Sequence, residues 1–279
     1  MKALLANNEI YFGSSGDGRP KLKRFLADVK EGSTYPSIWD FVPLNNAGSA
    51  EMQELLGKAT VFENPKPVGL LRELVKLGTE TDSIVLDFFA GSGTTWHAVA
   101  AENAQDGGQR RAVCVQLPEP TDNASDAHSS GFTTITALTE ERLRRAAKKI
   151  RDENPLFAGD LGFRVFKLDS SNIRAWEPKR DDLEQTLLES QEHIKSGRSE
   201  QDILYELLLK LGLELTVPIE TRSISAKAVH SIGGGVLMVC LAESVSAEEV
   251  EALANGIVAW HKELAPAGEV NLVFRDSAF

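Results

Sequence analysis

The sequence predicts an α/β fold with a doubly wound, Rossmann-like sheet and a second, smaller α/β unit toward its end. The apolar run SIVLDFF (83–89) is typical of a strand buried in a parallel sheet. The glycine-rich GSGTT (91–95) then leads directly into a helical pattern, and a second apolar run, RRAVCVQL (110–117), follows that helix. Strand, helix and strand in this order predict parallel strands with helices packed on the sheet.

The totals describe a globular protein without a membrane segment. Of its 279 residues, 42% are hydrophobic and 25% are charged, and no apolar run reaches the length of a membrane span. The start, MKALLANNEI (1–10), has too short an apolar segment for a secretory signal, so we expect the cytoplasm. The formal charge of −11 argues against a surface that coats nucleic acid as a whole, but it allows a local basic groove.

Neither cysteine nor histidine usage indicates a metal site or a disulfide. Cys114 and Cys240 each stand inside an apolar run, which predicts two buried thiols. The five histidines show no metal-type spacing with acids or cysteines, so we expect no metal.

Three parts follow from the pattern along the chain. Residues 1–60 are irregular and are typical of the tail of another region, which we interpret as target recognition or a linker. Residues 61–155 hold the strand–helix–strand order and form the predicted core. Residues 156–279 form the second α/β unit, and because the chain stops straight after a strand we expect that unit to be truncated.

Two further helices are predicted in the core. The first follows NPKP (64–67) and ends at Gly78. The second is LTEERLRRAAKKIRDEN (138–154), with Thr139 as its N-cap. We interpret its basic run as a solvated helix face, with contact to DNA phosphates as the alternative; the run comprises Arg142, Arg144, Arg145, Lys148, Lys149 and Arg151.

The last part alternates between strand and helix patterns. FRVFKL (163–168) is strand-like, and residues 181–215 are helical in two pieces that break near Ser196 and Gly197. GGGVLMVCL (233–241) predicts a buried strand, residues 246–264 an amphipathic helix, and EVNLVFRD (269–276) a further strand.

Three kinds of ligand commonly bind a glycine loop between a strand and a helix. A phosphate-binding P-loop requires a lysine after the second glycine, and none follows Gly93. A dinucleotide fingerprint requires a third glycine three positions later, where the bulky Trp96 stands, and Asp87 would repel a pyrophosphate. S-adenosylmethionine is the better match on charge, because an acid favours its sulfonium and ammonium groups.

The residues of the loop suit that cofactor. Asp87 ends the strand, Gly91 and Gly93 let the backbone approach a ligand, and Phe89 would wall one side. A tight turn without a ligand is the alternative for the loop taken alone. Trp96 and His97, in the helix that follows, are interpreted as a packing residue and a surface residue.

Two neighbouring segments favour the ligand. Glu119 stands at the end of the second strand, where an acid of a doubly wound sheet bonds ribose hydroxyls; a solvated loop acid is the alternative. Lys66, with Pro67, precedes a helix N-terminus, which suits the carboxylate of the methionine part; a rigid helix entry is the alternative.

With these pieces in this order, the sequence resembles the amino-group DNA methyltransferases of the β order, and most of all the modification (Mod) subunits of type III restriction–modification systems. The segments that carry the resemblance are FENPKPVGLL (62–71), LDFFAGSGTT (86–95), DGGQRRAVCVQLPE (106–119), GFTTITALTEERLRRA (131–146) and FRVFKLDSSNIRAW (163–176).

The resemblance implies methyl transfer from S-adenosylmethionine to the exocyclic amine of adenine in double-stranded DNA, with the base flipped out. It also implies a homodimer that works with a restriction subunit, and no membrane. By motif, the methionine part of the cofactor would be held by Asp87, Phe89, Gly91, Gly93 and Thr94. Lys66 and Pro67 would flank that part, and Glu119 would bind the ribose.

One family feature is missing from this chain. The family's catalytic tetrapeptide is Asp-Pro-Pro-Tyr or a close variant, and none of the 11 prolines here is adjacent to another. We therefore assign no catalytic residue, and we expect the C-terminal part of such a subunit, inactive alone. The alternatives are a cytosine-amine (N4) methyltransferase and a non-catalytic assembly module.

A basic cluster lies in the expected recognition tail. It consists of Arg19, Lys21, Lys23 and Arg24. We interpret it as a weak candidate for DNA contact, with surface solubility as the alternative.

Overall fold

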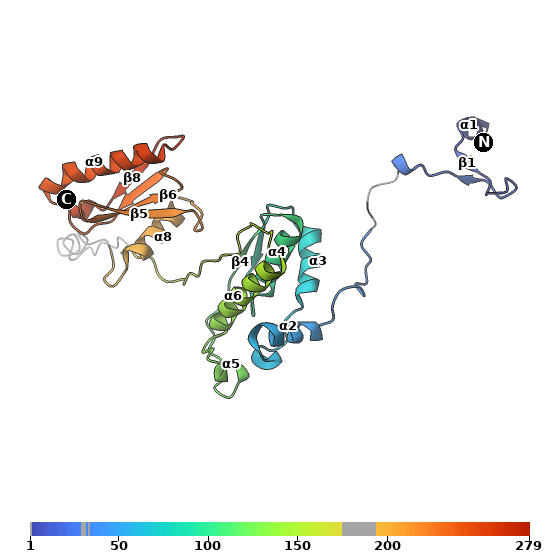
Figure 1. The fold of residues 1–279 in the computed structure, drawn as a ribbon, viewed down its shortest axis with the longest axis horizontal. Coiled ribbons are helices and arrows are strands. Elements are labelled where there is room, and N and C mark those ends of the chain that lie inside the picture. Colours follow the sequence, from blue (N-terminus) through green and yellow to red (C-terminus); the bar gives the residue numbers. More distant parts are fainter. Residues whose placement is uncertain (1, 29–31, 33, 175–193) are drawn as a thin grey trace, which may run out of the picture. The chain divides into compact units, whose positions relative to one another are not determined.

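A computed structural model describes residues 2–28, 32, 34–174 and 194–279 (Figure 1). The structure is mixed α/β and divides into two compact units, Met1–Gly162 and Phe163–Phe279. Each unit has its own strands and helices and is described by itself. The three-part domain division expected from the sequence stays a prediction.

The first unit begins with small elements. Two short strands, β1 and β2, pair antiparallel, with Ile10 opposite Leu22. The elements up to residue 28 are α1 (Lys2–Ala6), β1 (Ile10–Tyr11), β2 (Lys21–Leu22) and the 3-10 helix η1 (Leu26–Asp28).

The rest of the first unit is a parallel strand pair with helices. Strands β3 and β4 run parallel, from Ile84 opposite Arg111 to Asp87 opposite Cys114. Helix α4 connects them and packs on α3, α6 and β4. This confirms the predicted strand–helix–strand order and the helix ending at Gly78. The elements are α2 (Asn46–Leu56), η2 (Ala59–Val61), α3 (Val68–Gly78), β3 (Ile84–Asp87), α4 (Thr94–Asp106), β4 (Arg111–Cys114), α5 (Asp126–Ser129) and α6 (Ile135–Glu153).

The expectation that both strands are buried was wrong. Alternate side chains of β3 are largely exposed, 60% for both Ile84 and Leu86, while Val85 and Asp87 are half-buried. Strand β4 shows the same alternation. The reason is that α4 packs against one side of this sheet, so a continuous apolar run has only half of its residues covered.

Helix α6 begins earlier than predicted. Thr134 is its N-cap, and its hydroxyl accepts a hydrogen bond from the Ala137 amide at 3.2 Å. Thr134 has the extended backbone of an N-cap residue, whereas Thr139 lies inside the helix, where its hydroxyl donates to the Ile135 carbonyl at 2.8 Å.

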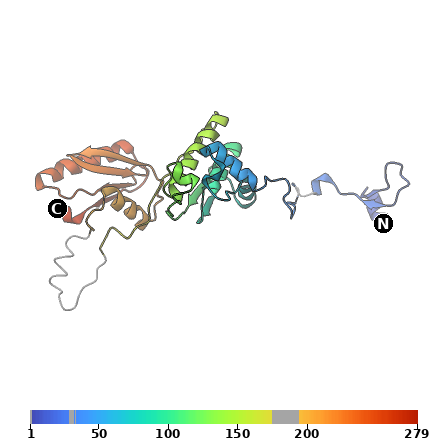
Figure 2. The same ribbon diagram turned by 90° about the horizontal axis from the view of Figure 1, so that it is seen from below.

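The second unit is a four-stranded sheet with a helix on each face (Figures 1 and 2). Its order is β5-β6-β7-β8, with antiparallel pairs except for the parallel pair of β7 and β8. Leu237 and Val239 of β7 pack in the cluster that contains α8, and Met238 and Cys240 in the cluster that contains α9. The elements are α8 (Glu200–Lys210), β5 (Ile219–Ile224), β6 (Lys227–Ile232), β7 (Leu237–Cys240), α9 (Ala247–Leu264), β8 (Asn271–Phe274) and η3 (Asp276–Ala278).

The sequence patterns of β7, α9 and β8 are confirmed, but two features of this unit differ from expectation. FRVFKL (163–168) forms no strand. The β5–β6 hairpin was not predicted, because its two turn residues, Ser225 and Ala226, have φ of +48° and +60° without the glycine or asparagine that usually marks such a turn. The first predicted helical piece falls mainly on residues 175–193, outside the described residues.

Both cysteines are free thiols, of which Cys240 is buried and Cys114 is half-buried. Among the helices that the structure describes, none is long and apolar enough to cross a membrane. Over the same residues, no group of three or more His, Cys, Asp or Glu side chains is placed to hold a metal ion.

Candidate functional site

The glycine loop connects the carboxyl end of β3 to the start of α4. Gly91 and Gly93 have left-handed backbones, with φ of +51° and +81°. A Cβ atom on Gly93 would lie 2.5 Å from Leu143 Cδ1, and one on Gly91 would lie 3.1 Å from the ring of Phe62. Both positions therefore favour glycine for its backbone conformation, and Gly93 also leaves no space for a Cβ atom.

Asp87 shapes this loop from the end of β3. Its Oδ1 accepts from the Phe89 amide at 3.1 Å, and its Oδ2 accepts from the Thr95 hydroxyl at 2.5 Å. A carboxylate has about four lone-pair sites, so two of them stay available to a cationic ligand. Burial and the charge of Asp87 together raise the pKa of the neighbouring Cys114 thiol to about 11, so that thiol is protonated at neutral pH.

Side chains from two other elements hold the loop backbone. The Gly91 amide donates to Gln116 Oε1 at 2.8 Å, from just beyond β4. The Gly91 carbonyl accepts from the Thr139 hydroxyl of α6 at 2.5 Å, and this hydroxyl shares its single proton with the Ile135 carbonyl. Both the amide and the carbonyl of Gly91 are thus hydrogen-bonded to side chains, which fixes the path of the loop backbone. Gln116 was not singled out in the sequence, because one polar residue at a strand end has no distinctive pattern.

Arg142 of α6 lies beneath the loop with no exposed surface. Its Nη1 donates to Ser92 Oγ at 2.5 Å and to Thr94 Oγ1 at 2.7 Å. Its Nη2 lies 3.6 Å from the Glu51 carboxylate of α2. Burial lowers the pKa of the guanidinium to about 10, partly opposed by the charge of Glu51, so Arg142 stays charged at neutral pH.

The interpretation of Arg142 as part of a solvated basic face was wrong. Leu138, Arg142, Ala146 and Ile150 recur at intervals of four residues and are all buried. That spacing was a usable signal, because residues four apart lie on one side of a helix. The charge of Arg142 concealed its place in the apolar stripe.

Glu51 extends this network to the segment that contains Lys66 and Pro67. Its two carboxylate oxygens accept from the Val68 amide, at the start of α3, at 3.0 and 3.1 Å. Burial is the main cause of a raised pKa for Glu51, and the Val68 bond and Arg142 oppose it. No sequence motif pointed to Glu51, whose partners lie 17 residues and more away along the chain.

His97 is buried in α4, so its interpretation as a surface residue was wrong. Burial, followed by the charge of Arg142, lowers the pKa of the imidazole to about 3. His97 is therefore neutral at physiological pH, and its Nδ1 is buried without a hydrogen-bond partner among the described residues. A neutral, enclosed imidazole is consistent with packing of α4.

The structure brings together most of the residues predicted for the cofactor. Asp87, Phe89, Gly91, Gly93 and Thr94 share the loop, where Phe89 is 82% exposed. The Thr94 hydroxyl is buried against Arg142 rather than directed outward.

The segment that carries Lys66 and Pro67 reaches the loop through another of its residues. Phe62 of this segment contributes the ring beside Gly91. Pro67 is buried, whereas Lys66 is exposed.

Glu119 and the N-terminal basic cluster lie on the surface. The carboxylate of Glu119 is exposed, while its main-chain carbonyl accepts from the Ile135 amide at 2.9 Å. In the basic cluster, Lys23 is half-buried and donates to Asn8 Oδ1 at 2.6 Å. The other three members are exposed; they are Arg19, Lys21 and Arg24.

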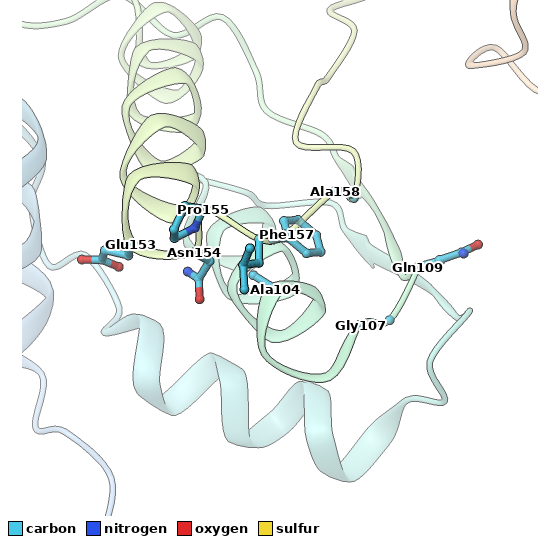
Figure 3. A pocket seen from close by; sticks show the side chains of 11 residues that line it. Ala104, Gly107, Gln109, Glu153, Asn154, Pro155, Phe157 and Ala158 are labelled. Atoms are coloured by element: carbon cyan, nitrogen blue, oxygen red, sulfur yellow. The ribbon is translucent and has the colours of Figure 1, made fainter.

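An open pocket of about 740 Å³ lies at the other end of the helices, between the turn after α4 and the turn after α6 (Figure 3). Gly107, Gln109, Asn154 and Phe157 contribute to its lining. A helix of the length of α4 extends about 20 Å, so this pocket is far from the glycine loop and plays no part in the candidate site.

Comparison with known proteins finds a matching family and several relatives of this chain. Residues 13–140 match the family described as DNA methylase. The chain is 41% identical over 164 residues to the type III restriction-modification enzyme StyLTI Mod subunit of Salmonella typhimurium, covering 59% of this chain and 25% of the relative.

Two further Mod subunits match more of the chain. It is 34% identical over 224 residues to the EcoPI Mod subunit of Escherichia phage P1, covering 78% of this chain and 33% of the relative. It is 32% identical over 271 residues to the EcoP15I Mod subunit of Escherichia coli, covering 95% of this chain and 39% of the relative. The chain thus spans between a quarter and two fifths of the length of these relatives.

Proposed function

We propose that this chain is the S-adenosylmethionine-binding part of a Mod-like DNA methyltransferase, an enzyme that methylates the exocyclic amine of adenine at specific DNA sites. The observation that carries the proposal is the loop at the end of β3. There an acid, two left-handed glycines and an exposed phenylalanine share one loop, whose backbone is hydrogen-bonded by Gln116 and by Thr139 of α6.

The residues present fit that cofactor. Asp87 keeps acceptor sites and a negative charge for an ammonium or sulfonium group, and no Cβ atom at Gly91 or Gly93 obstructs the backbone. When bound, S-adenosylmethionine supplies the methyl group. Phe89 would pack against the ligand, and Thr94 would act through the fixed start of α4. We assign Lys66 and Pro67 to the methionine end and Glu119 to the ribose.

The proposal also includes the sheet type, the domain division, the partners and the location of the protein. We propose that β3 and β4 are part of a doubly wound, Rossmann-like sheet, which the parallel pair and its connecting helix α4 support. We further propose the three-part division at residues 60 and 155, a homodimer, a restriction subunit as partner, and a cytoplasmic location, where the DNA substrate would be.

Catalysis requires residues that this chain lacks. Since it has no Asp-Pro-Pro-Tyr element to present a flipped base, we expect the chain alone to bind the cofactor without transferring its methyl group. The names of the relatives include Mod subunits of type III enzymes, which favours adenine over the cytosine amine.

Calorimetric titration with S-adenosylmethionine tests the proposal. We expect binding by the chain, weakened about tenfold or more by Asp87→Asn, which removes the charge but keeps the shape. Asp122→Asn is the matched control, because Asp122 also accepts from an amide two residues on, at 2.8 Å, outside the loop. No binding by a folded chain would remove the proposal in favour of a non-catalytic assembly module.

A further inference from the structure

Helix α2 packs directly against the backbone of the segment that contains Lys66 and Pro67. We call this segment, residues 64–67, the NPKP segment. A Cβ atom on Gly48 of α2 would lie 2.1 Å from the Pro65 carbonyl oxygen and 3.0 Å from the carbonyl carbon of Lys66. Both prolines of the segment are buried, whereas Lys66 between them is exposed. The helix therefore supports a backbone whose lysine side chain stays accessible to a ligand.

Glu51, one turn further along α2, holds the end of the same segment. Its two carboxylate oxygens accept from the Val68 amide at 3.0 and 3.1 Å. Val68 is the first residue of α3, so its amide has no partner within its own helix. The negative charge of Glu51 also suits the positive N-terminal end of α3. Gly48 and Glu51 therefore contact the chain before and directly after Pro67.

Arg142 of α6 lies between Glu51 and the glycine loop and is fully buried. Its Nη1 donates to the Ser92 and Thr94 hydroxyls at 2.5 and 2.7 Å. Its Nη2 lies 3.6 Å from the Glu51 carboxylate. Because a buried guanidinium without a nearby acid is an uncompensated charge, the two side chains stabilise each other. The contacts thus run from the loop through Arg142 and Glu51 to the start of α3.

Phe62 provides a second connection between the same two regions. Its ring packs beside Gly91, where a Cβ atom would lie 3.1 Å from it. Phe62 stands two residues before the NPKP segment, and Glu51 binds the amide directly after that segment. The segment is therefore connected to the glycine loop at both of its ends, once through an apolar ring and once through a buried ion pair.

The C-terminal end of α2 is fixed on α6 by polar contacts. Arg145 Nη1 donates to the Leu55 carbonyl at 2.9 Å, and this carbonyl is one of those that a helix end leaves without a partner. Lys149, one turn later in α6, pairs with Glu54. Helix α2 therefore cannot slide along α6 without breaking these bonds, so Gly48 and the helix positions beside it keep a constant place.

We propose that Gly48 and Glu51 of α2, together with Arg142 of α6, are positioning residues for the amino-acid end of S-adenosylmethionine. They hold the NPKP segment at a fixed place relative to the glycine loop. This inference rests on the proposed function, which assigns both regions to the methionine part of the cofactor. Two separate segments bind one ligand tightly only when they are ordered beforehand, because ordering them during binding costs free energy.

A purely structural role is the alternative for this network, because buried ion pairs also hold helices together. The two roles differ in their effect on a ligand that has no amino-acid end. Methylthioadenosine is such a ligand, since it keeps the adenosine and a neutral sulfur but carries neither an ammonium nor a carboxylate group. Positioning residues for the amino-acid end affect S-adenosylmethionine selectively, whereas a general loosening of the fold weakens the binding of both ligands.

Calorimetric titration with both ligands tests the proposal at a temperature where each variant is fully folded. We expect Arg142→Met and Gly48→Ala to weaken S-adenosylmethionine binding about tenfold and methylthioadenosine binding less than about twofold. Arg142→Lys keeps a charge beside Glu51 and should recover part of the lost affinity. Ile150→Ala is the matched control, because Ile150 is buried in α6 two turns beyond Arg142. It should lower the unfolding temperature without changing either affinity.

Two results of this titration would overturn the inference. The first is an unchanged affinity for S-adenosylmethionine in Arg142→Met and Gly48→Ala. The second is an equal loss of affinity for the two ligands, which would assign the network a structural role alone. Failure of the folded wild type to bind S-adenosylmethionine would instead overturn the proposed function.

Hydrogen exchange of the chain without ligand tests the same coupling separately. In Arg142→Met we expect the peptides covering residues 62–71 and 88–95 both to exchange about fivefold faster or more, and in Ile150→Ala neither to do so. Faster exchange in the loop peptide alone would show that Arg142 does not act on the NPKP segment, and the inference would fail. Because no ligand is needed, this measurement decides the inference even if the proposed function is wrong.

Discussion

At Gly93 of the glycine loop there is room for a hydrogen atom but not for the methyl group of an alanine. Gly93 combines a left-handed backbone with close contacts from Thr139 and Leu143 of α6. Gly107, at the other end of α4, is also left-handed, at φ +73°, but has open space around the position of a Cβ atom. The two glycines therefore separate the cost of conformation from the cost of crowding.

We expect Gly93→Ala to lower the free energy of unfolding by about 2–4 kcal/mol, because strain of about 1–2 kcal/mol adds to overpacking against α6. Gly107→Ala should cost only about 1–2 kcal/mol, from the backbone alone. Urea denaturation of both variants checks this. Equal costs would mean that α6 moves aside without penalty.

The lowered pKa of His97 leads us to expect that the free energy of unfolding depends on pH. Its pKa falls from 6.5 when unfolded to about 3 when folded, so between these values the unfolded chain binds the extra proton. The fold therefore has its full stability above pH 6.5, and protonation of His97 in the unfolded chain lowers that stability as pH falls toward 3, by up to roughly 5 kcal/mol. His97→Gln should flatten the dependence of unfolding free energy on pH in that window. An unchanged slope would show that other groups dominate.

At the scale of elements, helix caps were decided by small local contacts. Helix α8 begins with a reciprocal capping box, in which the Ser199 amide donates to Asp202 Oδ2 at 2.9 Å and the Asp202 amide donates to Ser199 Oγ at 3.2 Å. The bonds from Ser199 lower the pKa of Asp202, which is consistent with a charged carboxylate at a helix N-terminus.

Ser199→Ala should lower the free energy of unfolding by about 1 kcal/mol, since it leaves the Asp202 amide without its partner. Ser196→Ala, at an exposed position three residues earlier, provides the control and should be neutral. Thermal unfolding monitored by circular dichroism measures both. A neutral result for Ser199→Ala would indicate that water replaces the cap without cost.

Several elements were predicted correctly from the sequence pattern. Helices α3 and α9 and strand β7 were predicted because apolar spacing and stop signals agree with their environment. The start of α6 was misplaced because Thr134 and Thr139 are equivalent cap candidates in the sequence, and the local bond from the Ala137 amide selects Thr134. Thr139 instead bonds the Gly91 carbonyl, 48 residues away.

At the scale of the whole molecule, net charge and local charge have different consequences. The chain carries −11, which repels DNA at long range, so any DNA contact depends on local basic groups. The N-terminal cluster of Arg19, Lys21, Lys23 and Arg24 is the candidate, and three of its four members are exposed.

If these residues contact phosphates, changing all four to Ala should reduce the slope of log affinity against log salt by up to about 3–4, in a DNA titration at several salt concentrations. The matched control changes four exposed basic residues of α6, with the same change in charge; they are Arg144, Arg145, Lys148 and Arg151. An equal effect of the two sets would indicate a response to net charge. A larger effect of the α6 set would favour the helix as the DNA surface.

The sequence by itself determined the order of the elements in the core, the glycine loop and its acid, and the similarity to Mod subunits. These depend on short-range patterns: apolar periodicity, glycines at fixed offsets and motifs in a fixed order. Only the tertiary structure decided that Arg142 lies beneath the loop, that Glu51 reaches the start of α3, and that one side of β3 and β4 is bare. These features depend on which segments contact each other in the folded chain. The sequence alone does not distinguish a buried arginine from an exposed one, or a covered apolar residue from an uncovered one.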